Sequence, residues 1–201
     1  MSEILETLFG SKAKTRILRF FLLNPDNDHS IADITQKNML SVSQVRKELN
    51  ALKKIKFVTE KAKKREKYFV LNKSFHFYPE LRGLIAKSNI YPQCKSLGRI
   101  KGIGDAKLVL ISGIFLNHSK SKVDMILVVN NVNRSKLRSV MNNLEAEIGK
   151  EISFVLMNSE EFKYRLDMLD RFLIDFLDGP YNEIVNKIPG LKRFVAGLKK
   201  Y

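Results

Sequence analysis

One face of a predicted helix collects side chains that can donate to or accept from base edges and phosphates. Between Ser41 and Lys54, apolar residues recur at spacings of 3, 4 and 3, which is typical of an amphipathic helix. Gln44 can pair bidentately with adenine and Arg46 with guanine. The polar residues of this segment are Ser41, Ser43, Gln44, Arg46, Lys47, Asn50, Lys53 and Lys54. They predict a surface that reads duplex DNA.

A second basic segment follows directly. Two β-prone runs, 57–60 and 68–72, flank a cationic stretch and predict a hairpin with a basic tip. Lysine and arginine at such a tip neutralise phosphates without reading sequence. The cations expected to do so are Lys61, Lys63, Lys64, Arg65 and Lys67. Residues 41–73 together hold 11 basic and 3 acidic side chains, so the positive charge is focused rather than spread.

Capping residues predict where the helices before these segments begin and end. Ser11 is placed to cap a helix from Lys12 to about Leu23, which Asn24-Pro25 ends. Ser30 can cap a shorter helix over 31–37, and Asn38-Met39-Leu40 makes a tight turn. Either Ser41 or Ser43 then begins the polar-faced helix. The order is therefore helix, helix, turn, helix, hairpin.

This order, with the run Leu40-Ser41-Val42-Ser43-Gln44-Val45-Arg46-Lys47-Glu48-Leu49-Asn50-Ala51-Leu52 followed by Lys56-Phe57-Val58, resembles the winged helix-turn-helix of ArsR- and MarR-like transcription regulators. The resemblance covers about residues 8–75 and implies a recognition helix in the major groove and a wing on the backbone or the minor groove. Lys56 stands where those proteins have a glycine before the wing. The alternative interpretation is a protein-binding helix face beside a solvated hairpin.

Further along the chain, one carboxylate lies inside an apolar run. Runs 107–115, 123–129 and 151–157 predict strands, and 133–149 predicts a helix. Two carboxylates two residues apart on a strand can hold Mg²⁺ against a triphosphate. Here Asp124 is present, but Lys122 occupies the other position. An ammonium beside Asp124 repels a metal ion, so we expect no metal site.

The segment Leu110-Ile111-Ser112-Gly113-Ile114-Phe115, with 121–129, resembles the core of minimal nucleotidyltransferase domains, where Gly-Ser precedes a strand bearing Asp-x-Asp. This chain inverts the pair to Ser112-Gly113, keeps Asp124 alone, and has no carboxylate inside the third strand. We therefore expect a degenerate domain with no catalytic residues and no cofactor. A purely structural role for Asp124, satisfied by Lys122 or by backbone donors, is an equally open interpretation.

Two rival functions remain open from the sequence. An active nucleotidyltransferase, modifying a protein or nucleotide, would use Asp124 with a carboxylate such as Glu151 or Glu160 and the winged helix for targeting. An RNA-binding or adaptor protein is favoured only by diffuse charge, because single-strand readers use aromatic platforms that the polar face lacks. Magnesium-dependent nucleotide transfer that disappears in Asp124→Ala would identify the enzyme.

Composition limits the kinds of partner and the cell compartment that we expect for this protein. The 201 residues carry 36 Lys and Arg against 21 Asp and Glu, a net charge of +15 that favours a polyanionic partner. One cysteine and three scattered histidines argue against a disulfide framework and a zinc site. No apolar run reaches the length of a membrane span and no signal segment is evident. We expect a cytoplasmic protein without a membrane partner, whose effector the sequence does not identify.

The sequence thus predicts an α+β protein with an N-terminal winged helix-turn-helix and a small α/β nucleotidyltransferase-like domain with C-terminal helices. The expected division is 1–75 for the DNA-binding domain, 76–92 for a helical connector and 93–201 for the second domain. An apolar stripe predicts one helix from Tyr164 to Leu177 within that domain. A homodimer on double-stranded DNA is expected, because one winged helix reads few base pairs.

Overall fold

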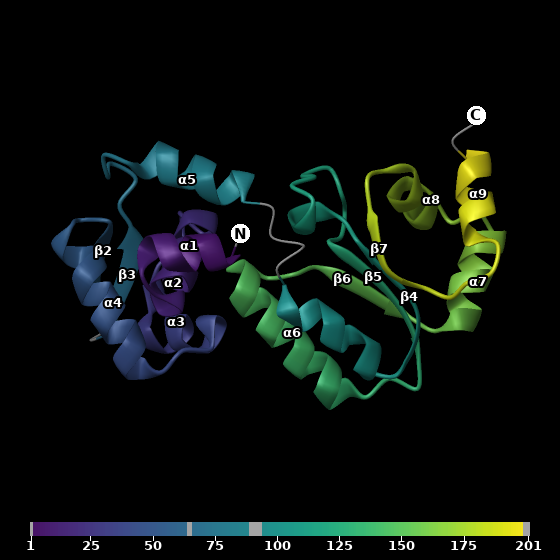
Figure 1. Ribbon diagram of the computed structural model, residues 1–201, viewed down its shortest axis with the longest axis horizontal. Coiled ribbons are helices and arrows are strands. Elements are labelled where there is room, and N and C mark those ends of the chain that lie inside the picture. Colours follow the sequence, from purple (N-terminus) through teal and green to yellow (C-terminus); the bar gives the residue numbers. More distant parts are fainter. Residues whose placement is uncertain (1, 64–65, 89–93, 199–201) are drawn as a thin grey trace. The chain divides into compact units, whose positions relative to one another are not determined.

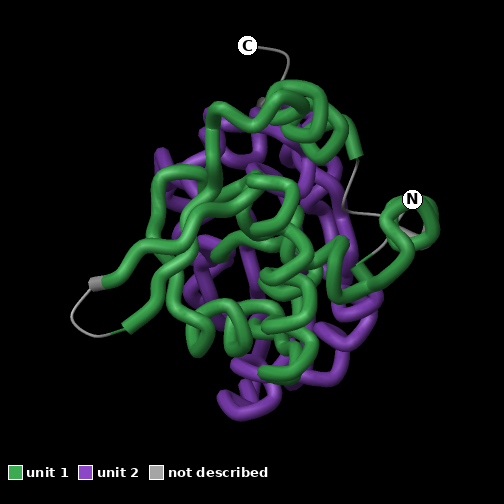
Figure 2. The backbone as a smooth tube through the Cα atoms, turned by 90° about the vertical axis from the view of Figure 1, so that its left-hand side faces the viewer, with its two compact units in different colours: residues 1–94, 142–151 green, residues 95–141, 152–201 purple. Residues whose placement is uncertain are grey.

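The computed structural model describes residues 2–63, 66–88 and 94–198 and shows a mixed α+β protein (Figure 1). The chain forms two compact units, shown in different colours in Figure 2. Unit 1 comprises residues 1–94 together with 142–151, and unit 2 comprises 95–141 together with 152–201. The sequence predicted a boundary after residue 92 and did not predict that a short later segment joins the first unit.

Among its described residues, unit 1 is built from five helices and a small sheet within 1–94, joined by the last part of a later helix, 142–148. The helices are α1 (Ser2–Phe9), α2 (Lys12–Leu23), α3 (Ile31–Asn38), α4 (Val42–Lys54) and α5 (Tyr78–Lys87). Ser11, Ser30 and Ser41 each accept a hydrogen bond from a backbone N–H of the helix that they begin. Ser11 and Ser30 were predicted in this role, and of the two serines considered for α4 it is Ser41, not Ser43, that caps the helix. Serine caps therefore fix where the three central helices start.

The sheet of unit 1 is antiparallel. Its strands are β1 (His29–Ser30), β2 (Val58–Lys63) and β3 (Glu66–Leu71), in the order β1-β3-β2. Strands β2 and β3 form the hairpin that the sequence predicted, with Val58 opposite Leu71 and Lys63 opposite Glu66. The third strand, β1, is too short to have been foreseen from residue pattern.

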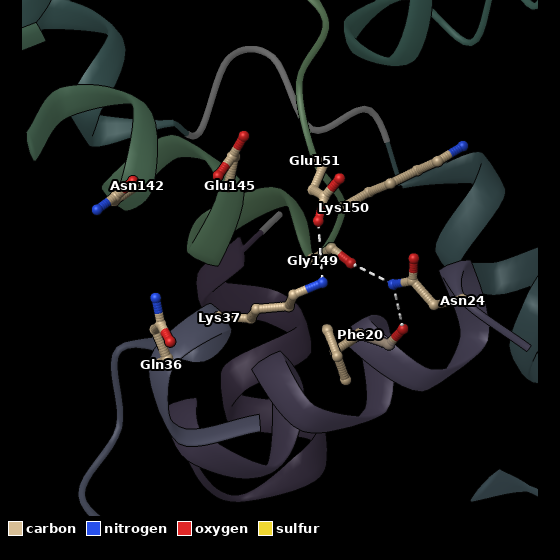
Figure 3. Close-up of a pocket in the computed structure, with 9 residues that line it drawn as sticks. All are labelled: Phe20, Asn24, Gln36, Lys37, Asn142, Glu145, Gly149, Lys150 and Glu151. Atoms are coloured by element: carbon tan, nitrogen blue, oxygen red, sulfur yellow. Dashed lines mark hydrogen bonds and ion pairs between the residues drawn. The ribbon is translucent and has the colours of Figure 1, made fainter. Parts of the chain in front are cut away.

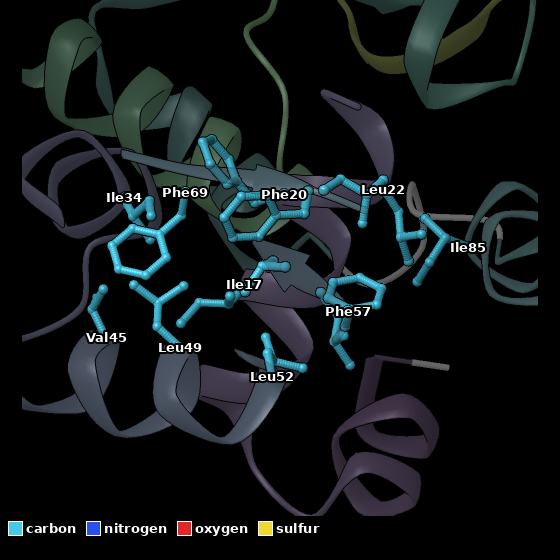
Figure 4. Close-up of a cluster of buried hydrophobic side chains, with 14 of the residues drawn as sticks. Ile17, Phe20, Leu22, Ile34, Val45, Leu49, Leu52, Phe57, Phe69 and Ile85 are labelled. Atoms are coloured by element: carbon cyan, nitrogen blue, oxygen red, sulfur yellow. The ribbon is translucent and has the colours of Figure 1, made fainter. Parts of the chain in front are cut away.

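Buried apolar side chains from the five helices and from strands β2 and β3 meet in one cluster (Figure 4). Ile17 and Phe21 of α2, Ile34 of α3 and Val45 of α4 are completely buried, and Phe57 closes the cluster at the start of the hairpin. This core holds one face of α4 and leaves its other face to solvent. Val42, predicted on the apolar face, is 45% exposed because it lies in the first turn.

Unit 2 contains a four-stranded mixed sheet in the order β6-β5-β4-β7. The strands are β4 (Asp105–Ile111), β5 (Met125–Asn130), β6 (Phe154–Met157) and β7 (Asn182–Asn186). β4 pairs antiparallel with β5 and β7, whereas β5 and β6 are parallel and are joined through α6 (Arg134–Ile148). β7 was not predicted, and the predicted first and third strands are shorter than expected.

Helices cover this sheet. Leu108, Leu110, Ile126 and Val128 pack into a cluster with α7 (Ser159–Asp167), α8 (Arg171–Asp178) and α9 (Leu191–Leu198). Two short 3₁₀ segments, η2 (Lys95–Gly102) and η3 (Gly113–Phe115), flank β4 along the chain. None of the helices in the described ranges has the length and apolarity needed to cross a bilayer.

The predicted single helix from Tyr164 to Leu177 is wrong. The chain breaks at Leu169, whose φ is +52°, and Asp170 begins α8 by accepting a hydrogen bond from Leu173 N at 3.1 Å. The apolar spacing continues through the break, which is why periodicity alone did not reveal it. Asp170 is the signal that could have done so, because aspartate is a preferred N-cap residue.

Candidate nucleic-acid interface and carboxylate site

Helix α4 is fixed to the rest of unit 1 by a buried carboxylate. Glu48 is 7% exposed and accepts a hydrogen bond from Ser11 Oγ at 3.0 Å, with Lys14 Nζ 3.9 Å away. Together with Val45, Leu49 and the rest of the core, this contact ties α4 to the start of α2. The orientation of the exposed face of α4 is therefore set by the unit itself.

The first turn of α4 uses two of the predicted DNA-contacting residues as a cap. Ser41 Oγ accepts from Gln44 N, while Gln44 Oε1 accepts from Ser41 N at 3.0 Å and from Ser41 Oγ at 3.1 Å. Ser43 Oγ lies 3.0 Å from Ser41 Oγ. Bidentate pairing of Gln44 with adenine would need its carboxamide oxygen, so this capping box opposes the expected role of Gln44.

The remaining polar residues of α4 form a solvent-facing stripe. Ser43, Arg46, Lys47, Asn50 and Lys54 succeed one another at helical spacings, and all are exposed. Arg46, Lys47 and Lys54 make no ion pair with other residues in the described part of the chain. Three cations and one carboxamide are thus held on one ridge without a partner. We refer to this set of five residues as the α4 ridge.

The hairpin cations are arranged differently, because several are paired with carboxylates. Glu60 on β2 accepts from Lys53 Nζ at 2.6 Å and lies 2.7 Å from Lys67 Nζ, and Lys61 Nζ lies 3.2 Å from Asp28. The hydrogen bonds from Lys53 and Lys67 lower the pKa of Glu60 to about 2. Glu60 therefore remains ionised and pairs with one lysine predicted on the polar face of α4, Lys53, and with one predicted to neutralise phosphate, Lys67.

The tip of the hairpin lies partly outside the described residues. Lys64 and Arg65 belong to that gap, and the side chain of Lys63 is not described either. The predicted contacts at these three positions stay predictions.

Lys56 precedes β2 and has a left-handed backbone conformation. Its φ is +59°, in the left-handed region that disfavours residues with a Cβ. The turn is held by hydrogen bonds from Lys56 N to Lys53 O and from Asn72 Nδ2 to Lys56 O. The chain therefore makes this turn with lysine, at a cost in strain.

In unit 2, Asp124 is engaged by three hydrogen-bond donors. Its Oδ1 accepts from Ile114 N at 2.8 Å, and its Oδ2 accepts from Ser153 N at 2.9 Å and from Ser153 Oγ at 2.8 Å. Lys122 does not pair with Asp124; its Nζ lies 2.9 Å from Asp175 Oδ2. The carboxylate joins the start of β5 to the turn after β4 and to the segment before β6, which is a structural role.

The Ser112-Gly113 turn is shaped around that carboxylate. Gly113 has a φ of +49°, and a Cβ built on it would lie 2.1 Å from Asp124 Oδ1. Ser112 is 2% exposed and donates to Pro180 O at 2.6 Å. Glycine is thus required for the close approach of the turn to Asp124. All three residues of the predicted degenerate motif lie together, with their polar groups directed at other parts of the protein.

A pocket of about 300 Å³ opens beside this turn. His118, Lys120, Lys122, Asp175 and Asp178 supply its charged and titratable groups, and two phenylalanines also line it. Asp124 is not among the lining residues. No cluster of three or more His, Cys, Asp or Glu side chains suited to a metal ion occurs within the ranges that the structure describes.

The segment 142–151 lines a second pocket in unit 1, of about 190 Å³ (Figure 3). Asn24 Nδ2 donates to Phe20 O at 2.7 Å and to Gly149 O at 2.8 Å, and Lys37 Nζ lies 2.9 Å from Glu151 Oε1. These contacts satisfy a carbonyl just beyond the end of α6 and join the segment to α2 and α3. Glu151, one of the carboxylates weighed for catalysis, is used in this ion pair.

Two further buried groups lie near the end of α6 in unit 1. Arg19 is 5% exposed and donates through Nη1 to Glu147 O. Burial raises the pKa of the Cys94 thiol to about 12, so this cysteine stays protonated at neutral pH and is a poor nucleophile. Neither group points to chemistry on a substrate.

Comparison of the chain with protein-family models, with curated proteins and with solved structures gave no match.

Proposed function

We propose that this protein binds duplex DNA with sequence preference and acts as a transcription regulator, with α3 and α4 as a helix-turn-helix and the β2–β3 hairpin as a wing. The α4 ridge is the observation that carries the proposal. It presents Arg46, Lys47 and Lys54 without ion-pair partners in the described chain, on a helix whose other face is locked into a core. Such a helix fits the major groove.

Roles within the ridge follow from position and chemistry. Side chains on the groove-facing side of a recognition helix meet base edges, so Arg46 is assigned to guanine. Asn50 is assigned to adenine in place of Gln44, because its carboxamide is free whereas that of Gln44 caps the helix. Lys54, at the end of α4, is assigned to a phosphate.

The test begins with selection from a random duplex library at physiological salt, followed by binding measurements on the enriched motif. Arg46→Ala and Asn50→Ala should each lose about 1 to 3 kcal/mol of discrimination at one base pair. Lys54→Ala should weaken binding to all sequences alike and reduce the salt slope by about 1. Lys87→Ala, which removes an exposed cation from α5, is the control and should change neither.

Two results would contradict the proposal. One is an unenriched library despite measurable binding, which would leave α4 as a nonspecific anchor. The other is equal behaviour of Arg46→Ala and Lys87→Ala on the selected motif. Dimerisation is part of the same proposal: a palindromic or direct-repeat motif and a dimer by light scattering on DNA would support it, and a monomer at micromolar concentration with and without DNA would oppose it.

A further inference from the structure

Unit 2 has a cationic surface that the proposed function does not use. Residues 95–104 and 131–143 together carry six Lys and Arg and no Asp or Glu. The six are Lys95, Arg99 and Lys101 on η2 and Arg134, Lys136 and Arg138 on α6. All six side chains are exposed. We refer to these six residues as the η2–α6 surface.

The two segments are joined at one end. Asn133, which precedes α6, donates its N–H to Ile103 O at 2.8 Å, and its side chain caps α6 by accepting from Lys136 N at 2.9 Å. Gly104 packs so closely on the loop before α6 that an added Cβ would lie 2.8 Å from Asn130 O. Lys101 and Arg134 are therefore held on neighbouring parts of the same unit.

The six cations have no counter-charge within the described chain, in contrast to several other cations of unit 2. Lys107 pairs with Asp105, Lys122 with Asp175, and Arg165 with Glu161. None of the six forms an ion pair with any residue that the structure describes. Moreover, the first turn of α6 holds cations and no acidic residue, although the N-terminal end of a helix dipole favours negative charge. An external anion would relieve both imbalances.

The composition of the surface selects the kind of polyanion. No large apolar side chain is exposed within 95–104 or 131–143, all of which the structure describes, so nothing is available to insert into a lipid interface. The two segments also contain no Phe, Tyr or Trp on which an unpaired base could stack. Exposed lysine and arginine without apolar or aromatic neighbours suit the phosphates of a duplex.

We propose that the η2–α6 surface binds the phosphate backbone of duplex DNA, as a second contact site independent of the α4 ridge. It adds affinity without sequence information, because phosphates are the same at every base pair. Unit 2 then serves as a DNA-binding module in its own right, whatever its pocket holds.

The test compares two full-length quadruple variants that lose the same charge. The surface variant is R99Q/K101Q/R134Q/K136Q, and the control is K163Q/R171Q/K187Q/R193Q, which removes two lysines and two arginines from exposed positions elsewhere in unit 2. Binding to a 40-base-pair duplex of random sequence is followed by fluorescence anisotropy across a salt series. Circular dichroism verifies folding, and the charge-preserving set R99K/K101R/R134K/K136R should retain wild-type binding.

The expected result is a reduction of about 3.6 in the slope of log K against log salt for the surface variant, or about 0.9 for each of the four phosphates that the variant no longer neutralises. The control should change the slope by less than about 1. Base preference on a selected motif should stay that of the wild type in the surface variant and change in Arg46→Ala. If the wild-type protein shows no base preference, the proposed role of the α4 ridge is wrong. The difference in salt slope between the surface and control variants would still test whether the η2–α6 surface binds phosphates.

Equal slopes for the surface and control variants would overturn the inference. So would a larger loss of binding to phosphatidylserine vesicles, or to single-stranded RNA, than to duplex DNA, since either would assign the surface to another partner.

Discussion

The α4 ridge in unit 1 and the Asp124 turn in unit 2 differ in what their polar groups already contact. On the ridge, Arg46, Lys47 and Lys54 make no ion pair within the described residues and face solvent. At the turn, the carboxylate of Asp124 receives three hydrogen bonds from Ile114 and Ser153. The first arrangement leaves charge available to a partner, whereas the second uses it to hold loops together.

Residue type alone therefore does not identify a site. Asp124 and Arg46 were both singled out by type and position, yet only Arg46 keeps its hydrogen-bonding capacity. Gln44 repeats the lesson inside unit 1, since its oxygen is taken by the cap of α4. A polar residue can bind a partner only if its hydrogen-bonding groups are not already used within the protein, and a sequence motif does not show this.

Among the variants that test the structural role of the Asp124 turn, Gly113→Ala is expected to lose the most stability. The added Cβ would lie 2.1 Å from Asp124 Oδ1 on a backbone with a φ of +49°, so the turn must move away from the carboxylate. We expect a loss of about 3 to 5 kcal/mol in the free energy of unfolding, measured by urea denaturation. Gly98→Ala, with no atom within 4 Å of the new Cβ, is the control. Similar stability of the two variants would contradict the described turn.

A smaller loss is expected from Asp124→Asn. An amide offers one accepting oxygen and places its NH₂ against the donors of Ile114 or Ser153, so at least one of the three hydrogen bonds is lost. The cost should be about 1 kcal/mol, because the Ile114 donor is only partly buried and the Ser153 donors are exposed. Asp105→Asn, which only breaks an exposed pair with Lys107, should cost less than about 0.5 kcal/mol. Stabilisation by Asp124→Asn would instead indicate a carboxylate kept for function at the expense of stability.

Caps and apolar spacing made much of unit 1 predictable from sequence. Ser11, Ser30 and Ser41 fixed the helix starts, and the β-prone runs flanking a basic tip gave the hairpin. These signals are local: a serine oxygen and the N–H groups it caps are only a few residues apart. The candidate residues of α4 could be named for the same reason, because one helical face follows directly from spacing.

Other features depend on contacts between distant segments and left no local signal. The segment 142–151 joins unit 1 through Asn24 and Lys37, more than 110 residues away in sequence. Asp124 is held by Ser153, 29 residues further along the chain. The pairing of Lys53 and Lys67 with Glu60 also emerges only when the hairpin closes. A sequence pattern can name such residues but cannot say which of them already have partners.

Lys56→Gly should stabilise unit 1. Lysine at a φ of +59° carries a steric cost that glycine avoids, although glycine loses more backbone freedom on folding. We expect a net gain of about 0.5 to 1 kcal/mol in the free energy of unfolding. Lys56→Ala is the matched control, because it removes the ammonium but keeps the Cβ, and should gain nothing. A loss of stability in Lys56→Gly would mean that the turn does not need a left-handed residue.

Glu60→Gln should leave two lysines beside the hairpin without an ion-pair partner, like the cations of the α4 ridge. Loss of the carboxylate releases Lys53 and Lys67 for phosphates. The slope of log K against log salt for DNA binding should steepen by about 0.9 for each released lysine that reaches a phosphate. Glu66→Gln is the control, since Glu66 is exposed and accepts a hydrogen bond from the hydroxyl of Tyr68. An unchanged slope in Glu60→Gln would show that the two lysines do not reach DNA.

The smallest effect concerns pH and the buried side chain of His29. The centroid of its ring lies 4.4 Å from that of Phe20, and its Nε2 has no hydrogen-bond partner among the residues that the structure describes. Burial, followed by the charge of Lys37, lowers its pKa below the usual 6.5. The unfolded chain therefore binds a proton near pH 6.5 before the folded protein does. Stability contributed by the neutral ring is complete above that pH and is lost as the pH falls toward the folded pKa. In His29→Gln the drop in melting temperature between pH 7.5 and pH 5 should be smaller than in the wild type, whereas His76→Gln, at an exposed position, should leave it unchanged. An equal drop in both variants would mean that acid acts on other groups, because His29 would then have the same proton affinity in the folded and unfolded chains.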